Sequence, residues 1–224
     1  MNSDKKIVTS SDCGCNSSKP IKHEKNLPIM PLELQYMKDI DGNNVLSGRT
    51  YKMCIASTDS YNYDGVITEV KYRSWGGYDY LAAADEPLDI NLALQVEIQH
   101  SLGGYGYPVS NDPDSYFYMR VPGYNSPSKR NYIAADLVLN SIWIGATGLE
   151  SGETCPDCKW NFQRLLYNDF PSLGRRGVGN RILSRYQHNM GYASLIQADK
   201  PGDWLKFYTS NHPPTKMDLI VFIP

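Results

Sequence analysis

Strict alternation of apolar and polar residues over residues 88–98 constrains the fold more than any other stretch. A leucine, isoleucine or valine stands at every even position, and aspartate, asparagine, alanine, glutamine or glutamate stands between them. In a β-strand this period of two places one row on a buried face and the other toward water, whereas a helix would spread both rows around its circumference. The stretch therefore predicts a long strand, and the rest of the chain is expected to cover its apolar face.

Other short apolar segments extend this prediction to a mainly β fold, a β-sandwich or barrel with one or two helices and an extended N-terminal arm. Phe162, Leu165, Leu166 and Phe170 recur at helical spacing before Pro171, so residues 160–170 are the expected helix. The apolar run 132–146 fits either a buried strand or a short helix. Strands are expected at residues 50–56, 66–72, 116–121, 192–198, 204–208 and 219–223.

The chain divides into an arm and one domain. Residues 1–27 are rich in serine, asparagine, aspartate and lysine and poor in apolar residues, which predicts a flexible or partner-docked arm. Residues 28–224 are long enough to bury the core of a single mainly β domain. No apolar run predicts a signal peptide or a membrane span, and five cysteines, an odd number, fit a reducing compartment.

Composition limits the classes of partner. The chain has 22 basic and 24 acidic residues, and this net charge of −2 argues against a whole-protein affinity for nucleic acid or anionic membranes. Tyrosine is unusually common, with 17 residues against 5 phenylalanines. Tyrosine offers a large contact area with a polar tip, so this surplus is typical of surfaces that contact partners or sugars.

Basic residues concentrate between Lys159 and Asn189. This segment holds one lysine and five arginines against a single acid, Asp169. Such a cluster predicts contact with an anionic partner, either nucleic-acid phosphates or the acidic face of another subunit. A solvated face or internal ion pairs would give the same pattern. The candidate contact residues are Arg175, Arg176, Arg181 and Arg185.

Four cysteines form two close pairs, Cys13 with Cys15 and Cys155 with Cys158. Four thiolates from two such pairs would make a tetrahedral zinc site that ties the arm to the domain, although the first pair is one residue tighter than usual. A redox dithiol and unconnected thiols are the alternatives. Zinc is therefore a possible cofactor, and no other cofactor is expected.

Two further groups of residues could carry a function. Cys54 with His100, or a pair of carboxylates, could form the centre of a hydrolase, although no sequence motif supports either. Trp204, Phe207 and Tyr208 beside Asp203 could form a platform on which sugars stack. Alternation along that strand places Trp204 and Phe207 on opposite faces, so part of the set belongs to the core.

The chain as a whole resembles the collar or ring proteins that connect head and tail in crAss-like, short-tailed bacteriophages. The resemblance rests on the polar arm, the loops 61–63 and 104–107 rich in tyrosine, asparagine and glycine, the long alternating strands, the free cysteines and the apolar last strand. It implies a homo-oligomeric ring between portal and tail proteins, with a channel wide enough for DNA. It also implies a place in the virion, after assembly in the host cytoplasm, and no enzymatic activity.

Three functions remain open at this point. The first is a structural virion protein that assembles through β-pairing and tyrosine-rich contacts. The second is a lectin-like carbohydrate-binding module or a tail-associated glycan-binding protein, which a cluster of solvent-facing aromatic residues would favour. The third is a hydrolase built on Cys54 or on carboxylates, which a thiol of lowered pKa in a cleft would favour.

Overall fold

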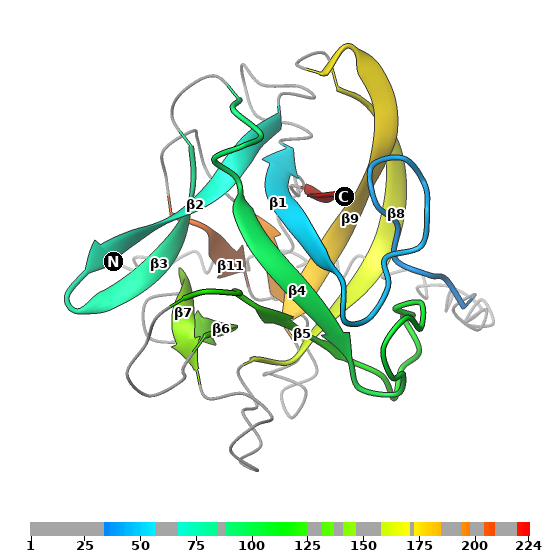
Figure 1. Ribbon diagram of the computed structural model, residues 1–224, viewed down its shortest axis with the longest axis horizontal. Coiled ribbons are helices and arrows are strands. Elements are labelled where there is room, and N and C mark those ends of the chain that lie inside the picture. The colour runs from blue at the N-terminus through cyan, green and yellow to red at the C-terminus, as the bar shows by residue number, and fades with distance from the viewer. Residues whose placement is uncertain are drawn as a thin grey trace, which may run out of the picture. The chain divides into compact units, whose positions relative to one another are not determined.

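The computed structural model describes residues 34–56, 67–84, 88–124, 131–136, 141–146, 158–170, 173–184, 194–197, 204–208 and 219–224. Over these residues the regular elements are β-strands, which confirms the predicted mainly β fold (Figure 1). The strands are β1 (Thr50–Ala56), β2 (Ile67–Trp75), β3 (Tyr78–Ala83), β4 (Leu94–His100), β5 (Phe117–Arg120), β6 (Tyr132–Asp136), β7 (Ser141–Ala146), β8 (Trp160–Phe170), β9 (Arg175–Ser184), β10 (Ser194–Gln197), β11 (Lys206–Tyr208) and β12 (Leu219–Ile223).

Six of these strands close into an antiparallel barrel. They are hydrogen-bonded in the order β1, β4, β5, β8, β9 and β12, and β12 returns to β1. The other six form the hairpins β2–β3, β6–β7 and β10–β11. The first strand of each hairpin pairs with the barrel strand before it, so one four-strand unit occurs three times along the chain. This threefold pattern is the architecture of a β-trefoil.

The three hairpins meet at one end of the barrel. Strand β7 pairs with both β3 and β11, and Trp204, just before β11, forms a bridge with Ala82 of β3. At the end where β1 begins, three buried residues close the barrel through a ring of backbone hydrogen bonds. Met37 N donates to the Val109 carbonyl at 2.8 Å, Val109 N to the Val45 carbonyl at 3.0 Å, and Val45 N to the Met37 carbonyl at 2.8 Å.

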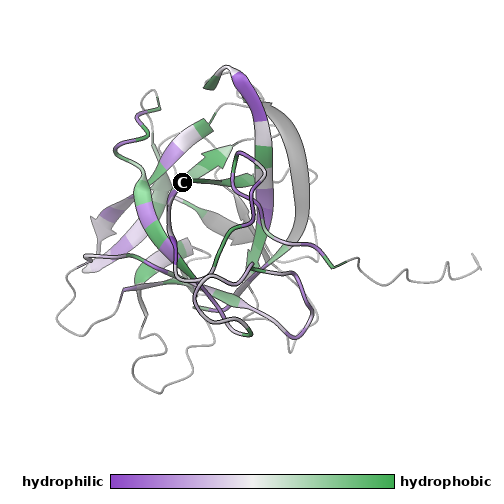
Figure 2. Ribbon diagram, turned by 45° about the vertical axis from the view of Figure 1, so that its right-hand side comes forward, coloured by the Kyte–Doolittle hydropathy of each residue, from purple (hydrophilic) through white to green (hydrophobic). Residues whose placement is uncertain are grey.

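Strand β4 confirms the alternation, but the strand is shorter than predicted. Leu94, Val96 and Ile98 are buried in the core, and Figure 2 shows hydrophobic and hydrophilic residues in alternation along several of the strands. Residues 88–93 form a turn instead of a strand. Their chain bends because the Asp89 carboxylate accepts a hydrogen bond from Asn91 N at 2.9 Å, a local bond that competes with strand pairing.

The helix predicted for residues 160–170 is wrong, because this segment is strand β8. It pairs with β9 along its length, and the two strands form the long curved hairpin in Figure 1. A bulge between Phe162 and Arg164 adds one residue to β8 and breaks the period of two, so the apolar spacing resembles that of a helix. The run 132–146 is likewise not one element but the two strands of the β6–β7 hairpin.

The apolar last strand is covered inside the fold. All five residues of β12 are buried, and the strand pairs with β1 and β9. The side chain of Asn180 on β9 completes this junction. Its Oδ1 accepts from Lys38 N at 3.1 Å, and its Nδ2 donates to the carbonyls of Lys38 at 2.8 Å and Ile220 at 3.3 Å.

Replacing Asn180 with leucine is expected to lower the free energy of unfolding by about 3 kcal/mol, because the backbone groups of Lys38 lose their partners inside the protein. Urea denaturation monitored by circular dichroism measures the loss. The exposed Asn91, replaced with alanine, is the control and should change stability by less than about 0.5 kcal/mol. Equal losses in the two variants would contradict the role given to the Asn180 amide.

Candidate functional site

Aromatic rings gather on one face of the β2–β3 hairpin. Directly opposed residues of an antiparallel pair share a face, and the register places Trp75 opposite Tyr78 and Arg73 opposite Tyr80. Trp75, Tyr78 and Tyr80 therefore lie on the same side. The ring centroids of Trp75 and Tyr80 are 6.2 Å apart in a T-shaped contact. Trp75 is 60% exposed and Tyr78 is 53% exposed, so this face presents large apolar rings to solvent.

The neighbouring hairpins extend this face. Trp143 of β7 lies opposite Tyr80, and Trp204 lies opposite Ala82. Their rings make T-shaped contacts, Trp143 with Tyr78 at 5.4 Å and Trp204 with Tyr80 at 5.7 Å between centroids. We call this set, Trp75, Tyr78, Tyr80, Trp143 and Trp204, the aromatic face. It contains three of the four tryptophans of the chain, and all three trefoil units contribute to it.

Polar groups lie among these rings. The Tyr80 hydroxyl donates a hydrogen bond to the Asp136 carboxylate at 3.2 Å. Burial, followed by the bond to Asp136, raises the pKa of Tyr80 and keeps its hydroxyl protonated. Asp136 shares the side of the sheet that carries Trp143, since Ala134 opposes Trp143 and Asp136 lies two residues further along β6. The Asp136 carboxylate therefore lies beside the rings of the aromatic face, and Arg73 of β2 is exposed on the same side of the hairpin.

A separate set of contacts anchors the hairpin from its opposite side. There the Asp79 carboxylate accepts hydrogen bonds from the Ser74 and Tyr124 hydroxyls. The Tyr72 and Tyr124 rings meet at right angles, 5.7 Å apart. Burial and the bond to Asp79 raise the pKa of Tyr124, so the hydroxyl stays a donor. These contacts tie the hairpin to the segment that follows β5 and so orient the aromatic face.

Only part of the sugar-stacking platform predicted from the sequence can be placed. Trp204 lies on the aromatic face, half-buried. Asp203 and the side chains of Phe207 and Tyr208 lie outside the described residues. Sequence reasoning missed Trp75, Tyr78 and Trp143. The signal for the first two was the Trp-Gly-Gly-Tyr turn between two strands, because such a turn places its flanking residues opposite each other.

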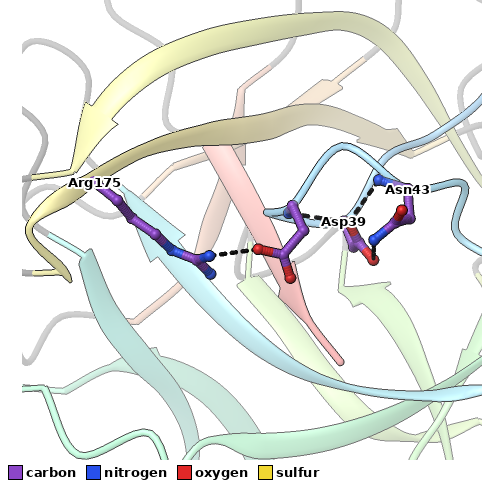
Figure 3. A network of polar contacts seen from close by, with 4 residues as sticks. Asp39, Asn43 and Arg175 are labelled. Carbon is purple, nitrogen blue, oxygen red and sulfur yellow. Dashed lines mark hydrogen bonds and ion pairs between the residues drawn. The ribbon is translucent and has the colours of Figure 1, made fainter.

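Three of the four arginines that are predicted to contact an anionic partner, Arg175, Arg176 and Arg181, lie among the described residues. Arg175 forms an ion pair with Asp41 in the turn that precedes β1 (Figure 3). That turn is held by Asp39, whose carboxylate accepts from Asn43 N at 2.9 Å and from Asp41 N at 3.0 Å. Arg176 is exposed and Arg181 is half-buried, and Arg185 lies outside the described residues. For Arg175 an internal ion pair, one of the two alternatives, is observed.

Among the described residues, no three histidine, cysteine or acidic side chains lie close enough together to hold a metal ion. Cys13, Cys15 and Cys155 of the predicted zinc site lie outside the described residues. Cys158 is buried and disulfide-bonded, which differs from the expected free thiols. The zinc site remains a prediction, and the Cys158 sulfur would have to leave its disulfide to take part.

Cys54 does not have the environment of a nucleophile. Its side chain is fully buried on β1, and it lies opposite the buried Glu69 of β2. Burial, followed by the charge of Glu69, raises the pKa of the thiol to about 12. His100 is at the end of β4, three residues beyond the last one that pairs with β1, and no contact joins it to Cys54 among the described interactions.

Comparison with known proteins gives the fold and no family. No protein-family model matches the sequence, and no curated protein matches it. The botulinum neurotoxin serotype D binding domain is similar in structure, with a TM-score of 0.51 and 10% identity over 84% of this chain and 44% of that chain. The lysenin pore has a TM-score of 0.45 and 9% identity, over 83% of this chain and 49% of the lysenin chain. Trypsin inhibitor 1 from Senna obtusifolia has a TM-score of 0.47 and 12% identity, over 85% of this chain and 89% of the inhibitor.

These similarities concern architecture alone. The chain spans less than half of the neurotoxin and lysenin chains. At 10% identity, the neurotoxin domain indicates a shared β fold and transfers no function. Over the described residues, no helix has both the length and the apolar character that crossing a membrane requires.

Proposed function

We propose that the protein is a binding protein without enzymatic activity, and that its aromatic face holds a carbohydrate. The observation that carries the proposal is the pair of half-exposed rings, Trp75 and Tyr78, continued by Trp143 and Trp204 and accompanied by the Asp136 carboxylate. A sugar ring has an apolar C–H face that stacks on aromatic rings, and hydroxyls at its edge that donate to carboxylates. The same rings would be costly to leave in water without such a ligand.

We propose a protein without enzymatic activity because of the environment of Cys54, the thiol that was the candidate nucleophile of a hydrolase. Cys54 is inaccessible, and a thiol with a pKa near 12 is protonated at neutral pH, whereas a nucleophilic cysteine needs a lowered pKa. The polar groups of the aromatic face are suited to recognition, because the Asp136 carboxylate is already engaged by a neutral hydroxyl.

Glycan-array binding of the full-length protein, followed by calorimetric titration of each hit, tests the proposal. Three of the four tryptophans lie on the aromatic face, so a bound sugar should also change the intrinsic fluorescence. We expect a related group of oligosaccharides to bind and to shift the emission. A protein that binds no glycan of a broad array contradicts the proposal.

The structural virion role is the second candidate, supported by a different surface. Leu102, Tyr105 and Tyr107 are between 63% and 80% exposed in the connection between β4 and β5. Monomeric proteins seldom expose several large apolar side chains in one short segment, and such patches are typical of subunit contacts. Identical subunits of a phage ring, its portal and tail neighbours, or DNA in its channel would be the partners of this role.

Light scattering of the purified native protein distinguishes this candidate. A ring held by the β4–β5 connection should give a defined oligomer, and replacing Tyr105 with serine should shift it to monomers. Tyr72, an exposed tyrosine on the β2–β3 hairpin, is the control when replaced with serine. A protein that is monomeric at all concentrations, and that does not assemble on phage connector proteins, contradicts the virion role.

A further inference from the structure

His100 occupies an unusual position at the base of the exposed 102–107 loop. Both ring nitrogens of His100 are buried, and neither has a hydrogen-bond partner. The backbone around it is well bonded, since His100 N donates to the Ser47 hydroxyl at 3.0 Å and Ser101 N to the Tyr116 carbonyl at 2.8 Å. The imidazole is therefore held in place by the chain and is itself unsatisfied.

The loop is packed closely over this imidazole. A Cβ added to Gly103 would lie 2.6 Å from the Tyr107 Cβ and 3.3 Å from His100 Nδ1, so glycine is needed for the approach. The loop is fastened to the segment before β1, because Ser47 N donates to the Tyr107 carbonyl and Gly106 N to the Ser47 carbonyl, both at 2.8 Å. A Cβ on Gly48 would lie 2.2 Å from the Tyr105 ring.

Few groups near His100 could stabilise a positive charge. Ser47 and Gly48, from the segment before β1, are uncharged, as is Phe117, which lies opposite His100 on β5. From the loop itself, Gly103 lies against the ring and Tyr107 packs on Gly103. Among the described residues, the charged group that acts on the ring is Asp112, further along the β4–β5 connection, and its attraction is smaller than the cost of burial. A proton on this imidazole would therefore be buried without an acceptor.

We propose that His100 makes the 102–107 loop a pH-sensitive element, which is closed when the imidazole is neutral and released when it is protonated. Release would free Tyr105 and Tyr107 from their contacts with Gly48 and Ser47. The 102–107 loop is separate from the aromatic face, which lies at the hairpin end of the barrel. The proposed pH response and the proposed carbohydrate binding therefore do not depend on each other.

The direction of the pH dependence follows from burial. The closed loop lowers the pKa of His100 below 6.5, the value that the released imidazole would have. The closed state is therefore fully favoured above about pH 6.5 and loses stability as the pH falls from there toward the lowered pKa. Over that window, the equilibrium constant for closure should fall by up to about tenfold per pH unit.

Amide hydrogen exchange of the full-length protein at pH 7.5 and pH 5.5, corrected for the intrinsic pH dependence of exchange, tests the proposal. The backbone amides of Gly106 and Tyr107 should lose protection at pH 5.5, by up to about tenfold, while the turn at residues 88–93 should not. In a His100→Phe variant, which cannot be protonated, the loop should keep its protection at both values. Loop protection that is the same at both pH values in the wild type overturns the proposal, whether or not the variant folds.

Discussion

Replacing Trp75 with alanine is expected to weaken binding of the glycan ligand by about 30- to 100-fold. The ring is 60% exposed in the free protein, and stacking against a sugar would bury much of that area, worth about 2–3 kcal/mol. Replacing Trp75 and Tyr78 together should abolish measurable binding, because both half-exposed rings are then lost. Calorimetric titration with the array hit measures the effect without depending on the tryptophans that remain.

Tyr72 provides a matched control on the same hairpin. It is 46% exposed and also makes a T-shaped ring contact, but it lies on the opposite side, with Tyr124 and Asp79. Replacing Tyr72 with alanine should change affinity by less than about twofold, a difference below 0.5 kcal/mol. If Tyr72→Ala weakens binding as much as Trp75→Ala does, the ligand does not lie on the aromatic face and the proposal is wrong.

Replacing Trp160 with alanine is expected to lower the free energy of unfolding by about 4 kcal/mol. Trp160 at the start of β8 is among the largest fully buried side chains, and its Nε1 donates to the Ile133 carbonyl at 2.9 Å. Truncation removes its packing and leaves that buried carbonyl without its partner. Denaturation in guanidinium chloride measures the loss. A phenylalanine at this position should restore part of the stability, because it refills most of the volume.

The exposed Trp75 is the control for this second prediction. The same substitution there should change stability by less than about 1 kcal/mol, because little of the ring is packed. The two variants should therefore differ in what they change. Trp160→Ala should lower stability, and Trp75→Ala should weaken glycan binding. A loss at Trp75 as large as that at Trp160 would mean that the aromatic face is part of the folding core.

The sequence predicts the class of fold well because strand alternation is a local property. Leu94, Val96 and Ile98 point into the core as their spacing indicates. The closed barrel and its threefold repeat depend on which strands pair, and no local pattern encodes that Cys54 lies opposite Val221. The helix error has a local cause, since the bulge after Phe162 shifts the apolar spacing by one residue.

The candidate site was only partly predictable for the same reason. Trp204 was identified because it stands beside other aromatic residues in the sequence. Trp143 lies within the most apolar run of the chain, where its spacing is that of a core residue. Its position beside Tyr78 follows from the pairing of β3 with β7, two strands from different trefoil units. The proposed phage-ring role stays a prediction, since it rests on overall resemblance.

The pairing of β1 with β12 also affects how the chain reaches this structure. Strand β1 is synthesised before β12 but cannot complete its pairing without it, because Met53 finds its partner Phe222 only when β12 has been made. Until then, one edge of β1 has unpaired backbone groups, next to apolar side chains that β12 will cover. Closing so distant a contact carries a high entropic cost before it gains any packing energy. Folding of this barrel is therefore expected to be slow, and the nascent chain to be prone to aggregation until β12 has been made and is in place.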